Sequence, residues 1–170
     1  QALPSPTRIM CIIYCIKSKH DTAVAAVRRT WGHKCDGFAA MSDETDPDLP
    51  ALNVPYEGKE EYKNIWQKVR SIWLMVYQRY YDDFEWFYIG GDDLYIIVEN
   101  LRLYLNSDEI VRAGWIKPAR ESANGGESGT AAEAVPLFLG RRFAQGGNTE
   151  RMFNSGGADL STASRRLSTT

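Results

Sequence analysis

The stretch that most constrains the fold of this chain runs from Trp86 to Arg102. It opens with an aromatic and aliphatic run of strand length, which ends at two glycines and is followed by Asp92 and Asp93. A pattern typical of a helix then resumes, and its apolar face would hold Leu94, Ile97, Val98, Leu101 and Leu105. The acid pair is therefore predicted at the C-terminal end of a buried strand.

This acid pair has two interpretations. In open α/β sheets, ligands bind in the crevice outside the carboxyl ends of the strands. Carboxylates in such a place suit a hard divalent cation, Mg²⁺ or Mn²⁺, which can also bind the oxygens of a diphosphate. Alternatively, Asp92 or Asp93 caps the helix that follows, because an Asp side chain accepts hydrogen bonds from free N–H groups at a helix start. The local sequence leaves both interpretations open.

The first half of the chain alternates between strand and helix patterns. A continuous apolar run at 8–16 predicts a central strand buried on both faces. The further predictions are a helix capped by Asp21 or Thr22 that ends near Lys34, a strand at 37–41, a loop at 42–55 and a long amphipathic helix at 62–81. This alternation predicts an α/β fold with a mainly parallel sheet and helices on both faces.

The second half has weaker signals. The predictions are a strand at 111–116, a loop insertion near 119–135, a strand at 136–143 and a turn of small residues at 154–158. We expect a flexible lead-in at 1–7, one domain at 8–158 and a frayed tail at 159–170.

Composition excludes several classes of protein. A length of 170 residues fits one domain with a core, and a net charge of −2 provides no electrostatic case for nucleic acid. No apolar run approaches the roughly 20 residues that span a membrane. Since the sequence begins with Gln1, an upstream anchor or signal remains open. The sequence contains no G-x-G-x-x-G after its first strand, no Walker A sequence and no G-x-S-x-G.

The chain has three cysteines and two histidines. A Cys11–Cys35 disulfide would close a loop of about 25 residues and contribute about 3 kcal/mol. The alternative, which composition favours, is three reduced and buried thiols. His20 and His33 form no metal-ligand spacing with the cysteines, so zinc is not expected and both are predicted to be surface or cap residues.

Several segments occur in an order and spacing that are specific when taken together. They are Arg8-Ile9-Met10-Cys11, Arg28-Arg29-Thr30-Trp31-Gly32 with Cys35, Glu57-Gly58-Lys59, Asn64-Ile65-Trp66-Gln67-Lys68, Trp86 to Arg102, Leu139-Gly140-Arg141-Arg142-Phe143 and Ser155-Gly156-Gly157-Ala158. Over most of residues 8–158 the chain thereby resembles the inverting β-1,3-glycosyltransferases, which include Fringe and the core 1 β-1,3-galactosyltransferases. The last two segments are most similar to the core 1 branch.

The resemblance implies a GT-A-like, three-layer α/β/α sandwich, here truncated at its C-terminus. It implies transfer of galactose from UDP-galactose to O-linked N-acetylgalactosamine on a glycoprotein or glycan acceptor, with inversion, a β-1,3 linkage and Mn²⁺. Members of the family are usually type II membrane proteins of the Golgi lumen, so a membrane would be reached only through an upstream anchor. The resemblance leaves a homodimer open.

The resemblance also assigns site residues. Asp93 takes the place of the acid that binds the metal directly, and Asp92 that of a water-mediated or sugar contact, whereas Gly91 replaces the first acid of the family motif. Glu57, Gly58, Lys59 and Lys68 are expected to bind UDP, with an exposed helix lysine as the alternative for Lys68. The cysteine pair is disulfide-bonded in family members, which reverses the expectation from composition for Cys11 and Cys35.

The chain departs from the family after Ala158. The family continues into a later acidic segment that carries the catalytic base, so the base of this protein is expected downstream of Thr170. The alternative function is a non-catalytic or fragmentary relative that acts as a UDP-sugar-binding, glycan-binding or scaffold module.

Overall fold

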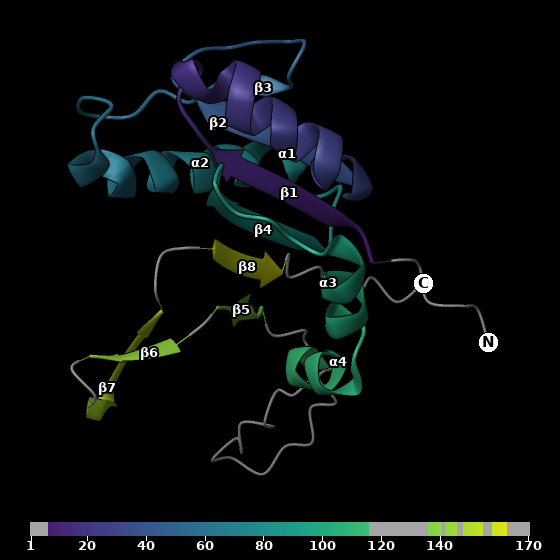
Figure 1. The fold of residues 1–170 in the computed structure, drawn as a ribbon. Helices are drawn as coiled ribbons and strands as arrows, with labels where there is room; N and C mark the ends of the chain where they lie inside the picture. The colour runs from purple at the N-terminus through teal and green to yellow at the C-terminus, as the bar shows by residue number, and fades with distance from the viewer. Residues whose placement is uncertain (1–6, 116–135, 141, 146–147, 155–157, 163–170) are drawn as a thin grey trace, which may run out of the picture.

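The computed structural model describes residues 7–115, 136–140, 142–145, 148–154 and 158–162 (Figure 1). Its strands are β1 (Ile9–Tyr14), β2 (Gly37–Ser42), β3 (Ala51–Asn53), β4 (Trp86–Gly91), β5 (Phe138–Leu139), β6 (Arg142–Gln145), β7 (Asn148–Asn154) and β8 (Ala158–Thr162). Its α-helices are α1 (Ala25–Thr30), α2 (Ile65–Tyr80), α3 (Val98–Leu105) and α4 (Asp108–Trp115). Short helical turns are η1 (Lys17–Lys19), η2 (His20–Val24), η3 (Gly32–Lys34) and η4 (Tyr62–Asn64).

Six of the strands form one sheet in the order β3-β2-β1-β4-β8-β5. The first four are parallel to one another, and β8 joins the edge of β4 in the antiparallel sense. The predicted α/β class with a mainly parallel sheet is thus confirmed. The chain runs outward from β1 through β2 to β3 and then returns to place β4 on the other side of β1 (Figure 1). The direction of winding therefore reverses between β1 and β4.

The central strand β1 is buried on both faces, as its continuous apolar run predicts. Ile9, Cys11 and Ile13 pack into one cluster with residues of α1, α3 and α4. Met10 and Ile12 pack on the opposite face with Ile72 and Val76 of α2. Because successive side chains of a strand point to opposite faces, one strand holds two helical layers together. The fold is the three-layer α/β/α sandwich that the family resemblance implied.

The helix predicted at 62–81 is confirmed as η4 and α2, in which Ile72 and Val76 are buried against the sheet whereas Trp66 and Tyr77 are exposed. The first helical region is also present, as η2, α1 and η3, but its predicted cap is wrong. It begins at His20 without a side-chain cap, and the Thr22 hydroxyl donates instead to the Lys19 carbonyl. Within the described residues, no helix is long and apolar enough to cross a membrane.

Three other predictions differ from the structure. Residues 111–115 of the strand predicted at 111–116 belong to helix α4, in which Val111 is exposed while Ile110 is buried against the core, and residue 116 lies outside the described residues. The predicted loop at 42–55 contains strand β3, which is short and pairs with β2 as its neighbour in the sheet. Residues 159–162 of the predicted frayed tail form β8, since the open edge of β4 supplies backbone partners that a polar sequence can also use. The predicted insertion near 119–135 lies outside the described residues, as do residues 155–157 of the small-residue turn predicted at 154–158, whose two ends belong to β7 and β8.

Cys11 and Cys35 are disulfide-bonded, as the family resemblance implies, and are not the reduced thiols that composition favours. Cys11 of β1 and Cys35, which follows η3, form a disulfide, and Cys15 is a buried free thiol. The prediction of surface histidines is correct for His33 and wrong for His20, whose side chain is 1% exposed. Ring nitrogen Nε2 of His20 lies 2.8 Å from the Ser42 hydroxyl, so this histidine joins η2 to β2 inside the fold.

Candidate functional site

A pocket lies where the winding of the sheet reverses, at the C-terminal ends of β1 and β4. Its volume is about 390 Å³, and its lining residues are Tyr14, Cys15, Ile16, Lys19, Glu60, Glu61, Tyr62, Ile65, Lys68, Gly91, Asp92 and Asp93. Open α/β sheets bind ligands at this kind of reversal, because the loops leave the two adjacent strands in opposite directions and a crevice remains between them.

The acid pair forms one wall of this pocket, directly after β4. Helix α3 begins at Val98 with Ile97 as its N-cap, so neither Asp92 nor Asp93 caps it. This position excludes the capping interpretation of the acid pair. Asp92 is half-buried and Asp93 is exposed. Burial raises the pKa of the Asp92 carboxyl above its ordinary value, and the neighbouring charge of Asp93 raises it further.

The two glycines before the acid pair permit close approaches that a side chain would block. A Cβ atom at Gly90 would lie 2.3 Å from the Tyr88 hydroxyl oxygen. A Cβ atom at Gly91 would lie 2.7 Å from Oδ1 of Asp93, so the Asp93 carboxylate folds back over the glycine. The glycine that replaces the first acid of the family motif therefore makes room for Asp93.

The donor set of this wall fits a hard divalent cation. Magnesium-like ions are commonly held by one or two carboxylates and complete their shell with water and phosphate oxygens. Asp92 and Asp93 supply such a pair, although no group of three His, Cys, Asp or Glu side chains that could hold a metal ion converges in the described residues, this pocket included. Burial raises the pKa of the Cys15 thiol to about 11, so this neighbour remains a neutral thiol near pH 7 and is a poor ligand.

Lys68 of helix α2 also lines the pocket. Its side chain is 3% exposed, which excludes the alternative of an exposed helix lysine. The ammonium group donates to the Cys15 carbonyl at 2.5 Å and to Oε2 of Glu60 at 2.8 Å. Lys68 therefore connects α2 to the end of β1 and to the loop that forms the second wall.

The loop residues predicted to bind UDP lie beside the pocket rather than in its lining. Glu57, Gly58 and Lys59 are exposed, and Gly58 has a φ of 108°, a conformation that favours glycine. The Lys59 carbonyl accepts hydrogen bonds from the Tyr56 hydroxyl and from Nδ2 of Asn64. These residues shape the loop, whereas the next three residues, Glu60 to Tyr62, face the pocket.

Sequence reasoning thus missed much of the lining. Glu60, Glu61 and Tyr62 come directly after the predicted loop motif, and Lys19 follows the first strand, so proximity in sequence was the available signal. Lys68, Asp92 and Asp93 were predicted, and the structure brings all three to one pocket. Whether they bind donor and metal stays a prediction.

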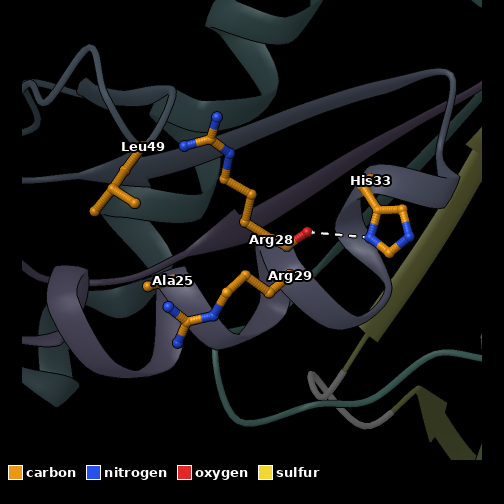
Figure 2. Close-up of a pocket in the computed structure, with 5 residues that line it drawn as sticks. All are labelled: Ala25, Arg28, Arg29, His33 and Leu49. Atoms are coloured by element: carbon orange, nitrogen blue, oxygen red, sulfur yellow. Dashed lines mark hydrogen bonds between the residues drawn. The ribbon is translucent and has the colours of Figure 1, made fainter.

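A second pocket, of about 470 Å³, lies between α1 and the loop before β3 (Figure 2). Ala25, Arg28, Arg29, His33 and Leu49 line it, and none of the predicted ligand-binding residues does. Arg28 donates to the Asp48 carbonyl, and Nδ1 of His33 lies 3.3 Å from the Arg28 carbonyl oxygen (Figure 2). Cations at the C-terminal end of a helix are favoured by its dipole, so these residues have a structural explanation.

The Lys68–Glu60 pair is expected to couple more strongly than a surface ion pair. In a double-mutant cycle with Lys68→Met and Glu60→Gln, we expect a coupling energy of about 2 kcal/mol, because the ammonium is buried while Glu60 is partly exposed. The Lys63–Glu61 pair of the same loop, at 2.7 Å but with side chains 76% and 41% exposed, is the matched control. Its coupling should stay below about 0.5 kcal/mol. Urea denaturation of the variants measures both, and equal couplings would contradict the prediction.

The similarity of the chain to known proteins agrees with the family resemblance seen in its motifs. No family model matches the chain. The chain is similar to glycoprotein-N-acetylgalactosamine 3-beta-galactosyltransferase 1 of Xenopus laevis, with 29% identity over 107 residues. The match covers 63% of this chain and 29% of that protein, so the chain spans less than a third of the length of its relative. This similarity agrees with the motifs and the fold described above and supports a relationship to the β-1,3-galactosyltransferases.

Proposed function

We propose that this chain forms the donor-binding part of a metal-dependent galactosyltransferase. The reaction is transfer of galactose from UDP-galactose to O-linked N-acetylgalactosamine on glycoproteins, with inversion and a β-1,3 linkage. The observation that carries this proposal is the acid pair at the end of β4, which shares a pocket with the buried Lys68 at the reversal point of the sheet. The similarity to a galactosyltransferase supports the sugar-transfer chemistry.

The charge of the pocket explains why a cation is needed. Four carboxylates and two lysines line it, namely Glu60, Glu61, Asp92, Asp93, Lys19 and Lys68. Glu60 is paired with Lys68 and Glu61 with Lys63, which leaves Asp92 and Asp93 against Lys19, so a diphosphate entering alone would still meet a net negative charge. A bound Mn²⁺ would supply charge neutralisation for the departing UDP. Asp93 is proposed as its direct ligand and Asp92 as a water-mediated or sugar contact.

The remaining parts of the reaction come from the family resemblance. The acceptor hydroxyl must lose its proton to a base during in-line attack, and that base is expected downstream of Thr170. We propose the Golgi lumen as the compartment, with a type II membrane anchor upstream. The Cys11–Cys35 disulfide supports an oxidising compartment of this kind.

The decisive experiment is calorimetric titration of the 170-residue chain with UDP. We expect binding in the presence of Mn²⁺, loss of that binding in EDTA, and its abolition by Asp93→Ala, because the variant removes the direct metal ligand. Asp83→Ala is the matched control, since it removes an exposed carboxylate of another acid pair that lies outside the pocket. UDP binding that survives both EDTA and Asp93→Ala would overturn the proposal.

A further inference from the structure

Tyr62 presents an aromatic ring to solvent at the edge of the donor pocket. Its side chain is 89% exposed, the largest value among the exposed large apolar residues of the described chain. Tyr62 lines the pocket, whereas Trp66, one helical turn later and 67% exposed, does not. An apolar ring that contacts so little protein contributes little to folding, so its place in a pocket points to a ligand.

The backbone that carries Tyr62 is held in place by the loop before it. The Asn64 amide N–H donates to the Glu61 carbonyl at 2.9 Å, and the Glu61 amide donates to the Lys59 carbonyl at 2.8 Å. The Asn64 side chain donates to that same Lys59 carbonyl, also at 2.8 Å. Lys68 binds the neighbouring Glu60. The ring is therefore presented from a fixed turn that continues directly into α2, which reduces the entropy lost when a ligand binds.

The charges of the pocket determine which part of a UDP-sugar fits this wall. Glu60 and Glu61 directly precede Tyr62 and line the same pocket, but both are already paired, Glu60 with Lys68 and Glu61 with Lys63, so this part of the lining offers a phosphate group no unpaired lysine. The diphosphate and its cation belong instead to the wall of Asp92 and Asp93. The nucleobase is the flat, uncharged part of the donor, and flat bases stack favourably on aromatic side chains.

We propose that Tyr62 stacks against the uracil ring of the donor and thereby sets the preference of the site for a nucleotide over a bare diphosphate. This inference rests on the proposed function, because it assigns one part of the same donor to one residue. It makes Tyr62 a binding residue that contacts substrate.

The test compares two probes, UDP and inorganic pyrophosphate, each titrated with Mn²⁺ into four forms of the chain. Tyr62→Ala should weaken UDP binding by roughly tenfold or more and leave pyrophosphate binding unchanged, because only UDP has a base to stack. Tyr62→Phe keeps the ring and should bind UDP within about twofold of the unsubstituted chain. Trp66→Ala is the matched control and should change neither affinity.

The outcomes separate this inference from the proposed function. If the unsubstituted chain binds neither probe with Mn²⁺, the proposed function fails and the inference fails with it. If UDP binds but Tyr62→Ala leaves its affinity unchanged, or weakens pyrophosphate equally, only the stacking role of Tyr62 is overturned. Circular dichroism of the variants checks folding, which a side chain this exposed should not affect.

Discussion

Replacing Trp31 by alanine should lower the free energy of unfolding by about 3 to 5 kcal/mol, the range typical of large aromatic residues removed from a core. Trp31 is 1% exposed and packs edge-on against Tyr88 and Phe38, with ring centroids 6.0 and 6.4 Å away. It therefore joins the end of α1 to two strands of the sheet. Urea denaturation followed by circular dichroism measures the loss.

A second variant, Trp31→Phe, separates packing from positioning. The indole N–H donates to the Leu94 carbonyl at 3.2 Å, and Leu94 directly follows the acid pair. Phenylalanine keeps most of the ring but leaves that carbonyl without its donor, so we expect a smaller loss of about 1 to 2 kcal/mol. We also expect weaker Mn²⁺-dependent UDP binding, because the turn that carries Asp92 and Asp93 loses an anchor. Unchanged UDP affinity in this variant would show that the anchor does not position the site.

Removing the disulfide by the double substitution Cys11→Ala and Cys35→Ala should lower the free energy of unfolding by about 3 kcal/mol. The bridge joins residues separated by 24 positions, and it restricts the unfolded chain by closing that loop. Cys11 belongs to the buried cluster that also contains Trp31, and Cys35 packs against that cluster, so lost packing adds to the effect.

Reductant provides the control for this prediction. Dithiothreitol should lower the stability of the unsubstituted chain toward that of the double variant, and it should leave the double variant unchanged. The remaining cysteine, Cys15, is buried and unpaired in both forms. Equal stability of the unsubstituted chain with and without reductant would contradict a structural role for the bridge.

The elements that the sequence predicts well are those whose own pattern is strong. Strands β1 and β4 are nearly continuous apolar runs, and α2 repeats one apolar face over 16 residues. Local spacing alone distinguishes such elements. Strands β3 and β8 were missed because they are short or polar, and their stability comes from pairing with neighbours that are distant in sequence. Helix α4 was mistaken for a strand because a short apolar run fits both the period of a helix and the period of a strand.

The candidate site also has one part that the local sequence predicts and another part that depends on long-range packing. The acid pair at the end of a buried strand follows from the sequence between Trp86 and Tyr95, because a strand that stops at two glycines must present what comes next at its edge. The sequence alone did not exclude a helix cap. That exclusion needed the observed start of α3 at Val98.

Apart from Lys68, which the family resemblance assigned to the donor site, the rest of the lining was decided by the tertiary structure. Glu60, Tyr62 and Lys68 meet the acid pair because α2 packs across the sheet and β4 lies beside β1. A strand order of this kind depends on pairings between segments that are far apart in the chain, and no local pattern encodes which strands become neighbours. The sequence by itself therefore determined one wall of the pocket, and long-range packing determined what faces it.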